Sequence, residues 1–275
     1  YYFVFGDWSS DVCSSDLGCW LLTGDADKAL PKPEKPADLG KGPKVLTADL
    51  NADGANDILA LFASGALLYK GIPGKPGELA APVAVEGVSG DGRNAAVVGD
   101  YDMDGLFDIF VASANGRNRI YHNLGEDKFD EMLAMSGEIE YMARQGGVDV
   151  ATGDVNNDGR QDIFIAYGGR APHVFFNRGF HSFGCAYELD VGDNNLLPGA
   201  ENGQQAGTLA DLNGDGALDM LVVLSDGAVW MLPRKVKGDA ALALKVASPS
   251  LLRVTAADKV RSYGAFNVYP GRPVL

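Results

Sequence analysis

Apolar and polar positions along this chain fall into four similar blocks. Each block has an apolar lead-in segment, then nine residues rich in Asp and Gly, then a second apolar run. The lead-in segments span 45–48, 95–99, 148–153 and 206–210, and the runs after the acidic segments read ILALF, IFVA, IFIA and MLVV. Such short apolar runs bounded by turn-forming residues are typical of buried β-strands. The pattern therefore predicts one short strand on each side of every acidic segment.

Each block continues in the same order beyond its second strand. A small polar turn (ASG, ASANG, YGG or SDG) leads to a third strand, and two blocks add an Asn and a Gly-bearing turn, HNLGEDKF and FNRGFHSF, before a fourth strand. The third strands carry an aromatic residue at what we interpret as one register, 19 to 22 residues after the first Asp: Tyr69, Tyr121, Phe175 or Phe176, and Trp230. Three or four short strands in a repeat of 51 to 57 residues predict a propeller blade. We therefore expect an all-β fold, a partial β-propeller with four recognisable blades plus fragments.

The acidic segments share one nine-residue spacing. They read DLNADGAND from Asp49, DYDMDGLFD from Asp100, DVNNDGRQD from Asp154 and DLNGDGALD from Asp211. Positions 1, 5 and 9 are Asp, position 3 is Asp or Asn, and position 6 is Gly. A hard cation such as Ca2+ takes about six to eight oxygen ligands, and Gly at position 6 allows the sharp turn that lets these side chains converge.

Position 7 of the acidic segment varies freely. A backbone carbonyl ligand would tolerate any side chain there, so the carbonyl oxygens of this position complete the expected ligand set. The residues at position 7 are Ala55, Leu106, Arg160 and Ala217.

Two other interpretations of the acidic segments were weighed. An EF-hand loop needs an acid at position 12, whereas position 12 here is apolar in all copies: Ala60, Val111, Ile165 and Val222. Plain Asp/Asn/Gly turns held by local hydrogen bonds are the remaining alternative. Carboxylates packed this closely without a cation would raise each other's pKa, so four copies favour a cation site.

Composition adds limits on partners. The net charge is −14 over 275 residues, which argues against a nucleic-acid surface because such a surface needs a basic stripe. No apolar stretch approaches the length of a transmembrane span. The chain has three cysteines, too few for a disulfide framework.

The two ends of the chain differ from its middle. Residues 1–17 are set aside because GDWSSDVCSSDL, from Gly6 to Leu17, resembles the translation of a common short-read sequencing adapter. Cys13 is then not a native cysteine, and the natural N-terminus with any signal peptide is missing. Residues 18–40 are interpreted as a partial blade and connector, 41–232 as the propeller repeats, and 233–275 as an atypical blade or the start of a C-terminal β domain. A weak helical spacing near 131–142 is interpreted as an excursion between blades.

The pattern D-x-[DN]-x-D-G-x-x-D, followed by a strand and by segments such as NRIYHNLGEDKF, resembles the FG-GAP/VCBS repeat family over about residues 41–232. The resemblance implies a calcium-binding β-propeller like the integrin α-subunit head, with about four structural Ca2+ ions. The side-chain ligands that it implies are Asp49, Asn51, Asp53 and Asp57; Asp100, Asp102, Asp104 and Asp108; Asp154, Asn156, Asp158 and Asp162; Asp211, Asn213, Asp215 and Asp219.

The function expected first is a non-catalytic scaffold, stabilised by calcium, that binds or adheres to a protein or glycan ligand. Extracellular calcium suits such sites, so we expect a secreted, periplasmic or cell-surface protein. A propeller lectin that stacks sugars on Tyr69, Tyr121 and Trp230 is one alternative, although packing between blades explains aromatics at one register more simply.

A calcium-dependent polysaccharide lyase or hydrolase is the other alternative. It would need a base and charge stabilisers converging in a cleft. The chain has three histidines, His122, His173 and His181, each interpreted as a solvated or hydrogen-bonded surface residue. The expectation is therefore that the protein is not an enzyme.

Overall fold

The computed structural model describes most of the four blocks. The described residues are 44–90, 95–113, 117–132, 139, 147–168, 170–185, 204–212, 214–224 and 229–232, with short strands at 2–5, 20–23, 234–235, 245–246 and 250–251. Most of the stretch 131–142, interpreted above as an excursion between blades, lies outside these residues. Among the described residues, no helix combines the length and apolar character needed to cross a membrane.

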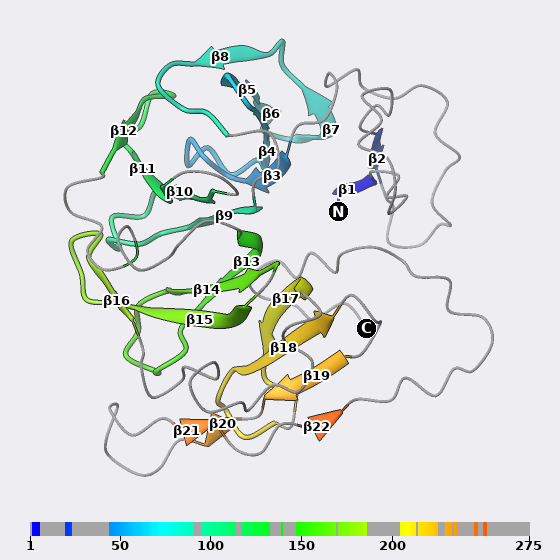
Figure 1. Ribbon diagram of the computed structural model, residues 1–275. Helices are drawn as coiled ribbons and strands as arrows, with labels where there is room; N and C mark the ends of the chain where they lie inside the picture. The colour runs from blue at the N-terminus through cyan, green and yellow to red at the C-terminus, as the bar shows by residue number, and fades with distance from the viewer. Residues whose placement is uncertain are drawn as a thin grey trace. The chain divides into compact units, whose positions relative to one another are not determined.

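Each block forms its own four-stranded antiparallel sheet, with strands that follow one another in chain order (Figure 1). The first sheet consists of β3 (Lys44–Ala48), β4 (Asp57–Phe62), β5 (Gly65–Tyr69) and β8 (Val83–Val85). The second consists of β9 (Ala95–Gly99), β10 (Asp108–Ala112), β11 (Arg119–Asn123) and β12 (Phe129–Glu131). The third consists of β13 (Gly147–Gly153), β14 (Asp162–Tyr167), β15 (Arg170–Asn177) and β16 (Phe183–Cys185). The fourth consists of β17 (Gln204–Ala210), β18 (Asp219–Leu224), β19 (Val229–Leu232) and β22 (Ser250–Leu251).

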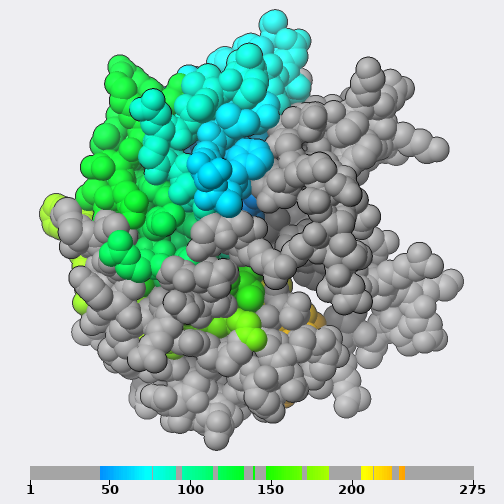
Figure 2. Space-filling view, turned by 45° about the horizontal axis from the view of Figure 1, so that its top comes forward, coloured from blue at the N-terminus to red at the C-terminus, as the bar shows by residue number. Residues whose placement is uncertain are grey.

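Three two-stranded sheets complete the described strands. They are β1 (Tyr2–Phe5) with β2 (Trp20–Thr23), β6 (Gly71–Ile72) with β7 (Lys75–Leu79), and β20 (Arg234–Lys235) with β21 (Lys245–Val246). The hairpin β6–β7 is inserted between the third and fourth strands of the first sheet. In the space-filling view, the described residues of this first block are coloured blue to cyan (Figure 2).

The chain divides into two compact units. The first comprises residues 1–93 and 123–130, and the second comprises 94–122 and 131–275. The turn and the start of the fourth strand of the second block are thus grouped with the first block.

The predicted all-β fold is confirmed, and each four-stranded meander has the topology of a propeller blade. Every acidic segment ends where the second strand of its sheet begins, at Asp57, Asp108, Asp162 and Asp219. Fourth strands were expected only in the second and third blocks. The first and fourth blocks also have one, β8 and β22, which were missed because the hairpins β6–β7 and β20–β21 separate them from the third strands β5 and β19.

Strand β14 shows how the blades of the second unit pack. All six of its residues are buried, and successive side chains of a strand point to opposite faces. Ile163, Ile165 and Tyr167 pack in a cluster with residues of the second block, whereas Phe164 and Ala166 pack in a cluster with residues of the fourth. The continuous apolar run of this strand therefore reflects packing layers on both of its faces.

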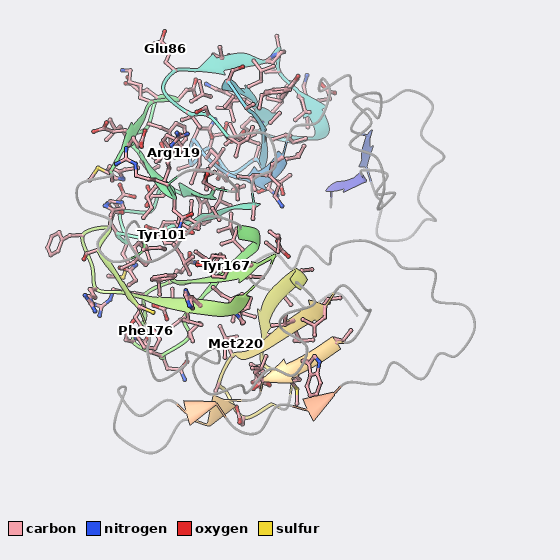
Figure 3. The ribbon with its side chains drawn as sticks, viewed as in Figure 1. Glu86, Tyr101, Arg119, Tyr167, Phe176 and Met220 are labelled. Carbon is pink, nitrogen blue, oxygen red and sulfur yellow. The ribbon has the colours of Figure 1, made fainter. Side chains whose placement is uncertain are left out.

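The cores on the two faces of β14 contain large side chains. Tyr101 and Tyr167 are 0% and 1% exposed and belong to the core shared by the second and third blocks. Met220 is 1% exposed and belongs to the core shared by the third and fourth (Figure 3). The ring of Tyr101 meets that of Phe183 edge-on at 5.5 Å.

The strand register corrects one expectation about the aromatics. Tyr69, Tyr121 and Phe175 pair with the first residue after the acidic segment of their own block: Ile58, Ile109 and Ile163. In the fourth block Leu232 pairs with the equivalent Met220, and Trp230 pairs with Val222. Trp230 therefore lies two residues before the shared register, whose position in the fourth block is occupied by Leu232.

Candidate metal centres

The four acidic loops are closed by the same set of hydrogen bonds, from backbone N–H groups to aspartate carboxylates. In the first loop, the N–H of Asp53 donates to Asp49 Oδ1 at 3.0 Å, and the N–H of Gly54 donates to Asp49 Oδ2 at 2.8 Å. The N–H of Ala55 donates to Asp53 Oδ1 at 2.8 Å. The equivalent bonds of the other three loops measure 2.8 to 3.2 Å. The shared spacing of the sequence is thus a shared conformation.

Two positions in each loop have a left-handed backbone. Glycine at position 6 has φ between +83° and +90° in the four loops, which confirms the turn expected there. Position 4 is also left-handed, with φ of 57° at Ala52, 64° at Met103 and 58° at Asn157. Residues with a Cβ rarely adopt this conformation. Position 4 suggests this conformation in the third and fourth loops, where it is Asn157 and Gly214, but not in the first two.

The aspartate at position 9 is fully buried in every loop. In the third loop, Asp162 Oδ2 accepts the N–H of Val155 at 2.8 Å, and its Oδ1 accepts the N–H of Asn177 at 2.8 Å. Asp57 accepts equivalent bonds from Leu50 and Gly71. This carboxylate therefore ties the start of the loop to the end of the third strand, a role that the ligand interpretation did not include.

The second loop brings three of its predicted ligands together. Oxygens of Asp100, Asp102 and Asp104 all lie within 4.8 Å of one another and can hold a metal ion. Asp108 lies instead in a second group, with Asp102, His122 and His181, whose ligand atoms are also within 4.8 Å of one another. The predicted set of this loop is thus divided between two groups that share Asp102.

The remaining predicted ligands lie in loops of the same shape. The role of these aspartates and asparagines as calcium ligands stays a prediction, as does that of the carbonyl oxygens at position 7. Asn213, at position 3 of the fourth loop, lies outside the described residues.

The electrostatics of the loops fit an oxygen-rich cation site. Burial raises the pKa of Asp162 to about 7, even though the N–H groups of Asn177 and Val155 oppose the shift, and the charges of Asp158 and Asp154 raise it further. Burial also raises the pKa of Asp57. A cation beside these carboxylates would offset both burial and mutual repulsion, and carboxylate oxygens are the ligands that Ca2+ takes.

In the second loop the same causes act on Asp102. Burial raises its pKa most, and the negative charges of Asp108 and Asp104 raise it further, while His181 opposes the shift. This loop therefore holds more negative charge than its own backbone hydrogen bonds offset.

Sequence comparison assigns the repeats. The family model described as FG-GAP-like repeat matches residues 100–165 and 154–222, so that each match runs from one acidic loop into the second strand of the next block. The matched residues, 100–222, are FG-GAP-like repeats.

Two curated proteins match the chain in part. Cartilage acidic protein 1 from Homo sapiens is 29% identical over 167 residues, which cover 58% of this chain and 24% of that protein. Integrin alpha-4 from Xenopus laevis is 28% identical over 167 residues, which cover 52% of this chain and 15% of that protein. The chain thus spans a quarter or less of the length of these curated relatives.

A solved structure supports the fold. A lectin from Agrocybe aegerita, described as recognising non-reducing terminal N-acetylglucosamine, matches with a TM-score of 0.57. It is 20% identical, and the match covers 85% of this chain and 60% of the lectin. At this identity the likeness concerns the fold alone.

An asparagine links consecutive FG-GAP-like repeats. In the second unit, Asn177 Nδ2 donates to the carbonyl oxygen of Tyr101, at position 2 of the preceding loop, at 2.7 Å. Its Oδ1 accepts the N–H of Gly179 at 2.8 Å. In the first unit, Asn123 donates to the carbonyl oxygen of Leu50 at 2.8 Å and accepts from Gly125 at 2.9 Å. The N-x-G motif of the repeat therefore connects each of these turns to the loop before it.

One FG-GAP-like loop carries its own cation. Arg160, at position 7 of the third loop, donates from its guanidinium to Asp158 Oδ2 at 2.9 Å and to the carbonyl oxygen of Asn177 at 2.9 Å. The side chain at position 7 therefore has hydrogen bonds of its own in this loop, whereas the expected role of the carbonyl oxygen at this position stays a prediction. Its guanidinium partly offsets the charge that a metal ion would neutralise.

The histidines correct a further expectation. His181 is 4% exposed rather than solvated, and its Nε2 lies 3.2 Å from Asp108 Oδ2. His122 Nδ1 lies 3.0 Å from Asp108 Oδ1. His173 is half-buried and packs against the rings of Tyr167 and Phe175. Local sequence could not reveal the His181–Asp108 contact, because these residues are 73 positions apart.

Proposed function

We propose that this chain is a non-catalytic, calcium-stabilised extracellular scaffold whose FG-GAP-like repeats bind a protein or glycan partner. One observation carries the proposal: the same carboxylate-rich loop, closed by the same hydrogen bonds, recurs at the edge of four sheets. A repeated structural cation site explains this recurrence, because each loop concentrates acidic oxygens where the chain passes from the first strand to the second.

The residues that would hold the ion are the ones with the predicted spacing. In the first loop these are Asp49, Asn51 and Asp53, with the carbonyl oxygen of Ala55 and the remaining lone pairs of Asp57. A bound Ca2+ supplies positive charge and coordination bonds that join the two ends of the loop. The N-x-G asparagines would extend this stabilisation to the neighbouring repeat, because they bind the loop backbone at position 2.

We propose an extracellular setting because of the calcium that the loops would bind. Calcium modules outside cells work with dissociation constants of about 10⁻⁴–10⁻³ M, so free Ca2+ there can fill modest sites. A secreted, periplasmic or cell-surface protein fits this requirement, as does the similarity to part of an integrin alpha-4. Adhesion to another protein is the partner class that this similarity favours.

A glycan is the second partner class, and the observation that favours it is the fold shared with an N-acetylglucosamine-recognising lectin. A glycan array probed with the chain in Ca2+, and again in EDTA, tests it. Specific signals in Ca2+ that disappear in EDTA would support a glycan partner, and no signal in either buffer would favour a protein partner.

The proposal also holds that the chain has no catalytic activity. Incubation with acidic polysaccharides, followed by ultraviolet detection of unsaturated uronate products and by an assay for reducing ends, tests this point. Products that accumulate with time would replace the scaffold by a lyase or a hydrolase.

The proposed metal role is tested in the first loop, because residues 49–57 include no Lys, Arg or His. Asp53→Asn keeps an oxygen able to accept the N–H of Ala55 but removes a negative ligand. We expect Ca2+ stoichiometry, measured by calorimetry, to fall by about one ion per chain. Asp130→Asn, on the exposed edge strand β12, is the matched control and should leave the stoichiometry unchanged. Equal stoichiometry in the wild type and Asp53→Asn would contradict the assignment.

A further inference from the structure

Two histidines and two aspartates converge in the second unit in a way that the calcium loops do not explain. His122 Nδ1 lies 3.0 Å from Asp108 Oδ1 and 3.7 Å from Asp102 Oδ2. His181 Nε2 lies 3.2 Å from Asp108 Oδ2 and 3.7 Å from the same Asp102 Oδ2. The imidazole ring centroids are 4.6 Å apart. Both histidines thus direct a ring nitrogen at the same pair of carboxylates.

The group is enclosed by protein. The side chains of Asp108 and His181 are 0% and 5% exposed, and those of His122 and Asp102 are 18% and 22% exposed. Three segments supply them: Asp102 and Asp108 are positions 3 and 9 of the second acidic loop, His122 lies on β11, and His181 lies in the turn between β15 and β16. The ring nitrogens and carboxylate oxygens of the group are therefore largely shielded from solvent, and His122 and Asp102 lie on its more exposed side.

The turn that carries His181 has an equivalent in the preceding repeat. Ser182 N–H donates to the carbonyl oxygen of Gly179, as Lys128 N–H does to that of Gly125. His181 and Asp127 both have left-handed φ, 55° and 62°. His181 therefore occupies the position that Asp127 occupies one repeat earlier.

The partner positions are equivalent as well. Lys70 and His122 each follow the third-strand tyrosine that pairs with the first residue after the acidic loop. In the first unit, Lys70 and Asp127 form a salt bridge. The second unit has two imidazoles in place of that oppositely charged pair. Two imidazoles do not attract each other as Lys and Asp do, but both can donate a lone pair to one cation.

The distances match a small, four-coordinate metal ion. Tetrahedral Zn2+ binds His nitrogen and carboxylate oxygen at about 2.0–2.2 Å, which places ligand atoms about 3.3 Å apart. The four nitrogen-to-oxygen distances of the group, 3.0, 3.2, 3.7 and 3.7 Å, bracket that value. Imidazole favours transition metals, whereas oxygen-only loops favour Ca2+.

We propose that His122, His181, Asp102 and Asp108 form a binding site for one divalent transition-metal ion of the zinc class. The ion joins the loop and third strand of the second repeat to the turn of the third repeat. It takes Asp102 from the carboxylate group of the second loop, so that Ca2+ and the transition metal compete there. The site does not depend on the proposed calcium role of the other three loops.

The test uses the full chain without an affinity tag, stripped of metal, first without Ca2+ and then in excess Ca2+, because the two ions compete for Asp102. Co2+ is the probe, because four-coordinate Co2+ absorbs visible light, and Zn2+ is then added to displace it. We expect one Co2+ per chain in the wild type, with visible bands lost on adding one equivalent of Zn2+. The double variant His122→Lys/His181→Asp restores the pair found one repeat earlier, and should fold while binding Zn2+ at least about 100-fold more weakly.

Two controls keep the result specific. His173→Gln removes the third histidine and should leave Co2+ binding unchanged. His122→Gln, at the more exposed member of the group, should weaken binding at least about 10-fold, and it replaces the double variant if that variant fails to fold.

Three outcomes would overturn the proposal. They are equal Zn2+ affinity in the wild type and in the folded double variant, a Co2+–thiolate absorption band that places the ion at a cysteine, and the absence of visible Co2+ bands in the wild type.

Discussion

The aspartate at position 9 is the residue that connects each acidic loop to the rest of its sheet. It is fully buried, and in the first and third loops it accepts backbone N–H groups from both the loop and the end of the third strand. A charged carboxylate in such a place is stabilised by those donors and destabilised by burial. In Asp162 burial dominates, which is why its pKa rises to about 7.

This shift predicts how pH acts on the metal-free protein. The pKa of Asp162 rises from 3.8 to about 7 on folding, so the folded state binds this proton more tightly than the unfolded chain does. The stability that Asp162 contributes is therefore fully present below pH 3.8 and is lost as pH rises through about 7. In EDTA, we expect the stability of the wild type relative to Asp162→Asn to fall across this window, by on the order of a few kcal/mol.

Thermal melts of both proteins at several pH values measure the difference. Ca2+ should reduce the pH dependence of the wild type, because a bound cation favours the charged carboxylate. A difference between the two proteins that stays constant with pH would contradict the shift.

At the scale of single residues, the sequence predicted the features that depend on neighbouring residues in the chain. Loop positions 1, 3, 5 and 6 are read from spacing, since their hydrogen bonds join residues at most five positions apart. The left-handed backbone at Ala52 and Met103 was missed, because neither residue type favours it. The convergence of His181 with Asp108 was missed because it depends on how one repeat stacks on the next.

At the scale of the strands and sheets, the third and fourth sheets of the second unit approach each other closely. A Cβ added at Gly207 on β17 would lie 2.5 Å from Phe164 Cε1 and 3.1 Å from Ala166 Cβ, both on β14. The N–H of Gly207 also donates to Asp149 Oδ2 at 3.1 Å. The third and fourth sheets are therefore in contact at a point where only glycine fits.

Gly207→Ala should separate these two sheets. Because Phe164 is fully buried and protein interiors are closely packed, we expect a loss of about 1–3 kcal/mol in the free energy of unfolding. Chemical denaturation measures this loss. Gly65→Ala is the control, because a Cβ at Gly65 meets no atom within 4 Å. Similar stabilities for the two variants would show that the sheets do not pack at Gly207.

The N-x-G asparagine gives a second prediction at this scale. Asn177 is 1% exposed and bonds both Tyr101 and Gly179. Asn177→Ala leaves the carbonyl oxygen of fully buried Tyr101 and the half-buried N–H of Gly179 without this partner, and the buried carbonyl oxygen alone costs about 1–3 kcal/mol. Denaturation should show this loss, whereas Asn56→Ala, at an exposed position, should change stability by less than about 0.5 kcal/mol. Equal effects of the two substitutions would contradict the link between repeats.

The elements themselves were largely readable from the sequence. Alternation, Gly turns and the 51- to 57-residue period specify the strands and their order, because each blade is built from neighbouring segments. Strands β8 and β22 were not readable, since inserted hairpins separate them from their sheets. The register of Trp230 was not readable either, because an aromatic two residues away from the shared position has the same character as one at that position.

At the scale of the whole molecule, charge is the main constraint. The net charge is −14, and the four loops contain thirteen aspartates. Four divalent ions would add eight positive charges and leave about −6. Without them, like charges repel within each loop and across the chain, which disfavours the compact state. Metal binding therefore neutralises charge and closes loops at the same places.

Thermal unfolding of the full chain in EDTA and in Ca2+, at equal ionic strength, tests this account most directly. A ligand at 100 times its dissociation constant stabilises by about 2.7 kcal/mol per site, and each kcal/mol raises Tm by about 2–4 °C in a chain of this size. We expect EDTA to lower Tm by at least about 10 °C, and excess Ca2+ to restore it. Superimposable melting curves in the two buffers would contradict the claim that the acidic loops are structural cation sites.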